Sequence, residues 1–445
     1  MSNLRLVAAV FSGVWGSAAG VVVSRPLPAL PSPIVELEAL AGPHRLLYAA
    51  TGPRYAFTGR PKSNRSYVCD VGRGTWRELP SHDALGRTAY PDGAVLLDGK
   101  KKIVTLFDAS GFRSIRTWAV DFTPEARGGG AVVSKDGRSL AYIVKEDATE
   151  RIRLVGPDGK EQDAGPWAEK ALQPIDAVLG VPRERLGLPG GLQFSGDDGD
   201  GNLIVDFYVM KEENSIGAFE ITLWIARLSR PAGELVGRPW RVGNFACPCG
   251  SYGAAYLDYH YETVHGSGAG LRIAPDATIK IVDLRNGQTA SRRPPQTVTE
   301  EVDGSGFPLA SSAGGAAVAC QFMCSSGPNR YERNTYVCWI RSDEWLALDK
   351  EGVERPAGAR NVVGPFRVIA VSPDASWVAW VTRAQSSTVR VATLVSRRRP
   401  EQNRSKAGGR GRVARRPECR DTPIGRLSAV SICGISQAEW VRGLE

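Results

Sequence analysis

The densest group of residues able to do acid–base or metal chemistry lies in residues 252–265, which read YGAAYLDYHYETVH. If residues 255–262 form a strand, Asp258, His260 and Glu262 project from one face, because alternate side chains of a strand share a face. Two carboxylates beside an imidazole can relay protons, hold a divalent cation or bind a polar ligand. The alternative is a hydrated outer strand, which we favour over catalysis because one strand supplies only part of a site. We predict binding residues here, and no catalytic residue.

Four of the eight cysteines stand in two close pairs, Cys247 with Cys249 and Cys320 with Cys324. In an oxidising compartment, one or two disulfides between such pairs would clamp neighbouring structural units. The alternative is a four-thiolate metal site, but zinc-binding pairs usually have two intervening residues, and neither of these pairs does. We therefore predict disulfides among these four cysteines and no metal.

The acidic run GDDGDGN at residues 196–202 suggests a calcium loop. An EF-hand loop would need glycine at position 203 and an acid at position 209, where this chain has Leu203 and Val209. We predict an elongated turn instead. The nucleophile motif Gly-x-Ser-x-Gly and the standard phosphate-binding glycine loops are absent from the sequence, so it predicts no cofactor.

The net charge of +9 belongs to one segment. Residues 397–420 hold ten Lys and Arg residues and two acids. Subtracting them from the 56 basic and 47 acidic residues of the chain leaves 46 and 45. The remainder therefore has no charge bias toward a polyanion, and the basic segment lacks aromatic side chains for base stacking. We predict no specific nucleic-acid partner.

The N-terminus reads MSNLRLVAAVFSGVWGSAAGVVV, in which one base precedes an apolar run and a small-residue site. This order is typical of a secretory signal peptide. An uncleaved membrane anchor is the second interpretation, since residues 6–23 reach the lower limit of a membrane span. A buried pair of strands is the third. We predict an exported protein, periplasmic or extracellular, with no membrane span after signal removal; a cytoplasmic location is the alternative.

Two distant segments share a pattern that predicts copies of one hairpin. Residues 65–79 read RSYVCDVGRGTWREL and residues 334–348 read NTYVCWIRSDEWLAL. Tyr, Val, Cys, Trp and Leu coincide without a gap. Each copy reads as a strand, a polar turn and a second strand that opens at Trp. The equivalent Cys69 and Cys338 are predicted to be buried thiols without a sulfur neighbour.

A second recurring pattern is an apolar strand, a short Asp/Gly turn and another apolar strand. It is clearest in AVVSKDGRSLAYIV (131–144) and IAVSPDASWVAWV (369–381). These two copies resemble the repeats of TolB-like propellers, and more loosely WD repeats, although the Trp-Asp pair is absent. The resemblance implies a ring of four-stranded blades. Related hydrolases carry an additional α/β domain, for which this chain has no room.

The fold class predicted is all-β: a β-propeller of six or seven four-stranded blades, closed by an N-terminal strand. We expect residues 34–40 to pair beside the blade that ends near residue 396, because that removes both open sheet edges. The predicted domains are residues 1–23 (signal peptide or anchor), 34–396 (propeller), 397–423 (basic disordered tail) and 424–445 (C-terminal appendage).

Three functions from different classes are compatible with these features. The leading one is an exported, non-enzymatic propeller, a monomer, that binds a protein or glycan partner in the cell envelope through its loop faces. The second is an envelope enzyme or metal-dependent lyase with its site at the central channel. The third is an intracellular WD-type scaffold whose basic tail is an address or a polyanion-binding arm.

The export hypothesis makes a direct prediction. Mature protein from the native host should begin near Gly20, because Ser17, Ala18 and Ala19 supply the small residues that signal peptidase requires. Intact-mass spectrometry of the purified protein measures this. Soluble protein that retains Met1 would contradict export.

Overall fold

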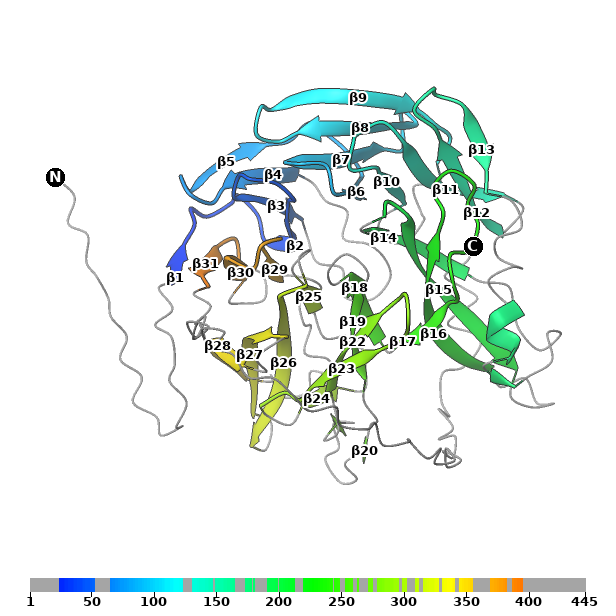
Figure 1. Cartoon of the computed structure of the whole chain (residues 1–445). Helices are drawn as coiled ribbons and strands as arrows, with labels where there is room; N and C mark the ends of the chain where they lie inside the picture. Colours follow the sequence, from blue (N-terminus) through cyan, green and yellow to red (C-terminus); the bar gives the residue numbers. More distant parts are fainter. Residues whose placement is uncertain are drawn as a thin grey trace, which may run out of the picture.

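The computed structural model is all-β and propeller-like, with its sheets arranged around a centre (Figure 1). It describes residues 24–394, apart from 53–64, 123–129, 147–148, 165–172, 178, 181–189, 199, 213–218, 243, 249–252, 259–261, 264–270, 275–277, 296–297, 302–308, 312–314, 328–329, 341–343, 355–368 and 382–385. The predicted segments 1–23, 397–423 and 424–445 lie outside these residues. One helical turn, at residues 173–177, accompanies the strands.

Four sheets have four strands each. In spatial order, the first consists of β2 (Ile34–Ala39), β3 (Leu46–Thr51), β4 (Arg65–Asp70) and β5 (Thr75–Glu78). The second consists of β14 (Gly190–Asp197), β15 (Leu203–Glu212), β16 (Phe219–Leu228) and β17 (Trp240–Val242). The third consists of β18 (Asn244–Pro248), β19 (Gly253–Asp258), β22 (Thr278–Asp283) and β23 (Thr289–Arg292). The fourth consists of β1 (Ser24–Pro26), β31 (Val389–Thr393), β30 (Trp377–Val381) and β29 (Ile369–Val371).

Two sheets are larger. The eight-stranded sheet contains β6 (Ala84–Thr88), β7 (Gly93–Asp98), β8 (Ile103–Asp108), β9 (Arg113–Ala119), β10 (Ala131–Val133), β11 (Leu140–Glu146), β12 (Thr149–Val155) and β13 (Glu161–Asp163). The seven-stranded sheet contains β20 (Glu262–Thr263), β21 (Leu271–Ala274), β24 (Val298–Glu301), β25 (Leu309–Ser311), β26 (Ala317–Gly327), β27 (Arg330–Trp339) and β28 (Glu344–Glu354).

The predicted number of six or seven separate blades is not confirmed by this hydrogen bonding. The eight-stranded sheet consists of two antiparallel series, β6–β9 and β10–β13, which a parallel contact between β6 and β10 joins into one sheet. The seven-stranded sheet likewise extends beyond the series β25–β28 through β24, β21 and β20. The described strands therefore form six hydrogen-bonded sheets.

The two copies of the repeated hairpin have the same register. Cys69 lies opposite Trp76 in the pair β4–β5, and Cys338 lies opposite Trp345 in the pair β27–β28. Both cysteines are buried, because the repeat places a small apolar side chain between packed sheets. The prediction of a common hairpin from these two segments is confirmed.

The apolar Asp/Gly-turn hairpins are confirmed as well, as β10–β11 and β29–β30. In the first, Gly137 has a φ of 71°, which glycine adopts at little cost. In the second, Ala375 occupies the equivalent position with a φ of 56°. The turn therefore imposes a left-handed residue even where the chain lacks glycine.

An N-terminal strand does close the ring, but not the one predicted. Residues 34–40 were expected beside the last blade, whereas β2 pairs with β3 in its own sheet. The closing strand is β1, whose residues Ser24–Pro26 pair with Arg390–Ala392 of β31. Figure 1 shows these two strands side by side, from opposite ends of the chain. Ile34, Val35 and Leu37 are buried between sheets, and this segment forms the first strand of its own sheet rather than the closing strand of the last blade.

The core lies in layers between neighbouring sheets. Val132 and Ile152 of the β10–β13 series pack with Phe194 and Phe207 of β14 and β15. The junction of β2–β5 with β29–β31 is built in the same way around Leu47 and Trp377, among other residues. Each fully buried side chain of this size contributes about 1.5–3 kcal/mol of transfer free energy. This packing fixes the positions of the ends of the sheets, and therefore the positions of the turns.

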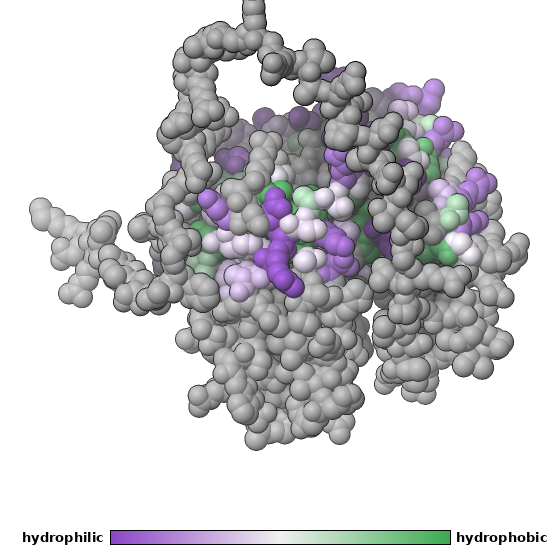
Figure 2. All heavy atoms as spheres, turned by 60° about the horizontal axis from the view of Figure 1, so that its bottom comes forward, coloured by the Kyte–Doolittle hydropathy of each residue, from purple (hydrophilic) through white to green (hydrophobic). Residues whose placement is uncertain are grey.

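The described surface has no large apolar patch. Ile115 and Tyr208 are its only exposed large hydrophobic residues, and Figure 2 shows hydrophilic and hydrophobic residues interspersed on the coloured part of one face. Among the described residues, no helix is long and apolar enough to cross a membrane.

Candidate functional site

Two of the three predicted binding residues, Asp258 and Glu262, lie in different strands. Strand β19 ends at Asp258, and Glu262 begins β20, which pairs with β21 in a different sheet. His260 lies outside the described residues. Asp258 and Glu262 therefore lie in strands of different sheets, so the condition for a common face is not met by this pair. The Asp258 carboxylate forms an ion pair with Lys280 of the adjacent strand β22.

Three of the four predicted disulfide cysteines lie on strands of neighbouring sheets. Cys247 belongs to β18, and Cys320 and Cys324 belong to β26. Cys249 lies outside the described residues. Cys320 is buried, and no disulfide joins Cys69, Cys320 and Cys338 to one another. Cys338 lies opposite Val318, two positions from Cys320, so Cys320 and Cys338 share one face of the sheet.

The turns that follow the first and third strands of each four-stranded series lie at the same end of the sheets, because consecutive antiparallel strands alternate in direction. We call this end the turn face. The side chains of its turns are held by local hydrogen bonds. In the β10–β11 turn, Asp136 accepts a hydrogen bond from the Arg138 N–H, 3.0 Å away. In the β29–β30 turn, Asp374 accepts one from the Ser376 N–H at the same distance.

A serine completes each of these two turns. The Ser134 hydroxyl accepts a hydrogen bond from the Ser139 N–H at 2.9 Å, and the Ser372 hydroxyl accepts one from the Trp377 N–H at 2.9 Å. The hydrogen bond from the Ser134 hydroxyl above all, and then that from the Arg138 N–H, lowers the pKa of Asp136. At Asp374 burial is the largest single effect and acts to raise the pKa, but the hydrogen bonds from the Ser376 N–H and from the Ser372 hydroxyl help to lower it below its ordinary value. The turns therefore carry ionised carboxylates in fixed positions.

The acidic run at 196–202 is a variant of this turn, as predicted. The Asp198 carboxylate accepts hydrogen bonds from the Asp200 N–H and the Asn202 N–H at 2.8 and 2.9 Å, and from Asn202 Nδ2 at 3.0 Å. Arg227 Nε donates a fourth, at 2.6 Å. Hydrogen-bond donors of the protein thus bind both carboxylate oxygens of Asp198, the same oxygens that a calcium ion would need as ligands.

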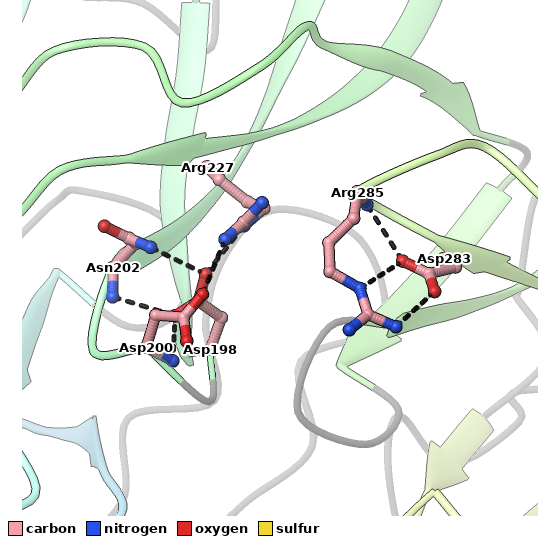
Figure 3. A network of polar contacts seen from close by, with 6 residues as sticks. All are labelled: Asp198, Asp200, Asn202, Arg227, Asp283 and Arg285. Carbon is pink, nitrogen blue, oxygen red and sulfur yellow. Dashed lines mark hydrogen bonds and ion pairs between the residues drawn. The ribbon is translucent and has the colours of Figure 1, made fainter.

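Arg227, from β16 of the same sheet, holds this turn. Its side chain is 8% exposed, that of Asp198 is 0% exposed, and a second carboxylate, Asp200, lies 3.4 Å from Nη2. Burial acts to raise the pKa of Asp198, but the hydrogen bonds from Asn202 and Arg227 outweigh it, so this pKa lies below its ordinary value. Figure 3 shows the network and, beyond it, the pair formed by Asp283 and Arg285.

Asp283 and Arg285 form an exposed counterpart of the buried pair. Arg285 donates from Nε and Nη2 to the two oxygens of Asp283, at 3.0 and 2.6 Å. This hydrogen bonding lowers the pKa of Asp283, and Arg227 from the neighbouring sheet acts in the same direction. Arg227 and Arg285 therefore both act on the Asp283 carboxylate, although they belong to neighbouring sheets.

A histidine links two further sheets at the turn face. His44 Nδ1 lies 2.6 Å from Asp92 Oδ2, which joins the β2–β3 turn to the β6–β7 turn. The hydrogen bond with Asp92 raises the pKa of His44 above its ordinary value. Because the folded-state pKa is raised, this link is complete below pH about 6.5 and is lost as the pH rises through the folded-state value.

Charged residues also line the inner strands near the centre of the ring. Arg87 of β6 forms an ion pair with Glu38 of β2, and both side chains are about one-quarter exposed (24% and 27%). Ser195 of β14 donates a hydrogen bond to Asp206 of β15 at 2.6 Å. Strand β14 lies close to β6. The pKa of Arg87 is raised, above all by Glu38 and to a smaller extent by Asp206. The carboxylates of Glu38 and Asp206 therefore both act on the Arg87 guanidinium.

The described side chains contain no group of three or more metal-ligating residues. The hydroxyl of Ser195 faces a carboxylate rather than an imidazole, so it lacks the base that activates a nucleophile. What the described part of the chain does present is a set of fixed, alternating charges, which suits recognition of a polar partner.

No family model matches the sequence, and no curated protein matches it. The structure is similar to that of hydrazine synthase from Kuenenia stuttgartiensis, with a TM-score of 0.42 and 11% identity over 80% of this chain and 94% of that one. Oligogalacturonate lyase from Vibrio parahaemolyticus has a TM-score of 0.43 and 12% identity, over 85% of this chain and 99% of that one. TolB from Acinetobacter baumannii has a TM-score of 0.35 and 14% identity, over 69% and 64% of the two chains. At these identities the likeness is one of fold alone.

The buried and exposed arginines of the turn face should differ in their contribution to stability. The variant Arg227→Met leaves the Asp198 carboxylate buried without its cation, so the free energy of unfolding should fall by about 3–5 kcal/mol. The matched variant Arg285→Met removes a guanidinium that is 51% exposed, and should cost less than about 1 kcal/mol. Urea denaturation of both variants measures the difference. Equal losses would contradict the assignment of Arg227 as a buried structural cation.

Proposed function

We propose that this chain is an exported, non-enzymatic β-propeller that binds a protein or glycan partner through the loops at its sheet ends. The observation that carries the proposal is the turn face, where acidic and basic side chains are fixed by turn hydrogen bonds. Binding residues held on a rigid scaffold lose little entropy when a partner binds. Charges of both signs would give such a face selectivity for a complementary polar surface.

The proposed ring has seven blades. The support is that β6–β9 and β10–β13 are each a complete antiparallel series of four, and that the contact between them involves two residue pairs of parallel strands. Inner strands of adjacent blades run parallel in such a ring. An experimental structure with a different number of four-stranded series would contradict this count.

Asp258, His260 and Glu262 stay proposed as binding residues, at the opposite end of the sheets. They lie in or beside the connection between β19 and β22, the second and third strands of their sheet. A second connection of this kind is the β7–β8 turn, which carries Lys100. The two ends of the ring therefore offer separate candidate surfaces, and an experiment can distinguish them.

Site-specific photo-crosslinking in the native host tests which end binds. A photoreactive residue at Arg73 or Lys160, whose side chains are 83% and 87% exposed on turn-face turns, should give a discrete adduct with a protein partner. Lys100 is the matched exposed position at the other end. For a glycan partner, binding to an array of envelope polysaccharides should weaken at least about tenfold in the Arg73→Glu/Lys160→Glu variant. Adducts from Lys100 alone, or unchanged glycan binding, would contradict the turn-face proposal.

The second candidate is an envelope enzyme or metal-dependent lyase with its site at the centre of the ring. The charged residues Glu38, Arg87 and Asp206 on or beside the inner strands favour it. Turnover of an envelope polysaccharide that is abolished by Glu38→Gln would support this candidate and contradict a purely binding role. In that case Glu38 would act as the acid–base residue, with Arg87 holding an anionic group.

The proposal of export includes a disulfide between Cys247 or Cys249 and Cys320 or Cys324. Its support is the backbone: β18, which carries Cys247, lies beside β25, and β25 pairs with β26 so that Leu309 lies opposite Cys320. A bridge from Cys247 to Cys320 would close a loop of about 70 residues and stabilise the fold by about 4 kcal/mol in chain-entropy models.

Thiol counting in denaturant without reductant tests this bridge. The chain has eight cysteines, so an exported protein with this one bridge should show about six reactive thiols, and one with two bridges about four. Eight reactive thiols in protein from the native host would favour a cytoplasmic location and the scaffold function. Cys69→Ser serves as the control, because loss of this buried thiol should lower the count in reductant by one and leave the bridge intact.

A further inference from the structure

Strand β9 is the outermost strand of the series β6–β9 and lies on the rim of the ring (Figure 1). Among the described strands it pairs with β8 alone. β9 has seven residues, with two arginines and no acid, whereas the outer strands β5, β13, β17 and β23 have three or four residues. The outer strand β28 is longer, but its sequence contains four acidic residues and one lysine. β9 therefore combines a positive charge with enough length to take up another strand.

The backbone of β9 is open on its outer side. The Val120 N–H, directly after β9, donates a hydrogen bond to the Lys102 carbonyl at 3.0 Å. Hydrogen-bonded pairs alternate along antiparallel strands, so the backbone of Trp118 also bonds to β8. The N–H and C=O groups of Thr117 and Ala119 therefore point away from β8, and both residues are exposed. These are the groups that an added strand would bind.

Two guanidinium groups beside this edge are each held on an aromatic ring. Arg77, from β5 of the preceding sheet, lies 3.7 Å from the centre of the Phe112 ring, and Arg116 of β9 lies 5.0 Å from that of Trp118. Arg116 Nη1 also donates to the Arg138 carbonyl at 2.9 Å. Within the described part of the chain, neither Arg77 nor Arg116 forms an ion pair with a carboxylate. Stacking on the rings thus positions two positive charges without neutralising them.

A strained turn places the ring that holds Arg77. Phe112 has a φ of 54°, a left-handed conformation that a bulky residue rarely adopts. Its ring packs edge-on against Phe107, with 5.2 Å between the ring centres. Strain of this kind persists only where the surrounding structure imposes it, and it concentrates at binding and active sites.

Acidic groups beside β9 are already paired. Asp108 accepts a hydrogen bond from the Ser110 hydroxyl at 2.7 Å and lies 3.6 Å from Arg113 Nε. Asp121 forms an ion pair with Lys102 at 2.6 Å. A second copy of β9 would place arginine beside arginine, and like charges on facing strands are destabilising. The charge therefore favours an acidic strand over a second copy of β9.

We propose that β9 is a docking edge for an extended, acidic segment of a partner protein, which adds to the sheet as a further strand. The outward groups of Thr117 and Ala119 would bond to its backbone, and Arg77 and Arg116 would pair with its carboxylates. Ile115, which a bulge leaves without a partner in β8, is 39% exposed and would contact an apolar side chain. This edge is a second surface, on the rim, and does not depend on binding at the turn face.

Binding of a fluorescent peptide of alternating Glu and Val residues to the full-length protein tests the edge. Only one edge of an added strand faces β9. Of two N-methylated forms, one methylated at the Val residues and one at the Glu residues, one should therefore bind at least about tenfold more weakly than the unmodified peptide. Hydrogen exchange of the complex should show about tenfold more protection of the Thr117 and Ala119 amides. The Trp118 amide should change little, because it is bonded to β8 in the free protein.

Charge variants complete the test. Arg77→Gln and Arg116→Gln should each weaken peptide binding about tenfold, while Lys145→Gln, which removes an exposed charge from β11, should leave it unchanged. Unchanged urea midpoints show that the variants are folded. Three results would overturn the proposal: no binding of the acidic peptide, equal binding of both N-methylated forms and the unmodified peptide, or equal losses in Lys145→Gln and Arg116→Gln. An anionic polysaccharide that binds with the same arginine dependence, while the peptide leaves Thr117 and Ala119 unprotected, would also overturn it.

Discussion

The pairing of β1 with β31 is the contact on which the rest of the ring depends. Three residue pairs, from Ser24–Pro26 to Arg390–Ala392, join the first strand of the described chain to the last. Without them β31 would be an open edge, and an unpaired strand edge can recruit another chain. The hydrogen bonds from the Leu27 N–H to the Val389 carbonyl and from the Leu30 N–H to the Ser387 carbonyl extend the seam. Closure of the ring therefore holds the sheets in place relative to one another, and the contacts between turns add to it.

With the sheets held in place, polar groups connect the ends of neighbouring sheets. Arg25 donates to the carbonyl groups of Val71 and Gly72, and Trp240 donates from Nε1 to the Leu284 carbonyl at 3.0 Å. Such contacts are individually modest, worth about 0.5–1.5 kcal/mol each. Their importance is positional, because they hold neighbouring turns at set distances. A partner that contacts several turns would meet a surface already in its binding arrangement.

The repeats were predictable from sequence because the residues that define them are local. The register of Cys69 with Trp76 and of Cys338 with Trp345 follows from one strand, one turn and a second strand. The closing strand was not predictable in the same way, since Ser24–Pro26 has only three residues and no apolar alternation. Its place is decided by β31, more than 360 positions along the chain. The apolar segment 34–39 looked like the better candidate and belongs to a buried strand instead.

The sequence patterns around the candidate sites predicted local structure to different extents. Asp258, His260 and Glu262 were grouped by their spacing, yet a change of sheet separates Asp258 from Glu262. The acidic turn at 196–202 was interpreted correctly, because three of the four hydrogen bonds to Asp198 come from residues four or fewer positions away. Asp197 and Asp198 show the limit of such interpretation. They are adjacent in sequence, but Asp198 has donors from its own turn, and Asp197 depends on Arg230 from a hairpin 33 positions away. Neighbouring aspartates thus acquire opposite pKa shifts, a difference that depends on the folded sheet bringing the end of β14 beside the segment after β16.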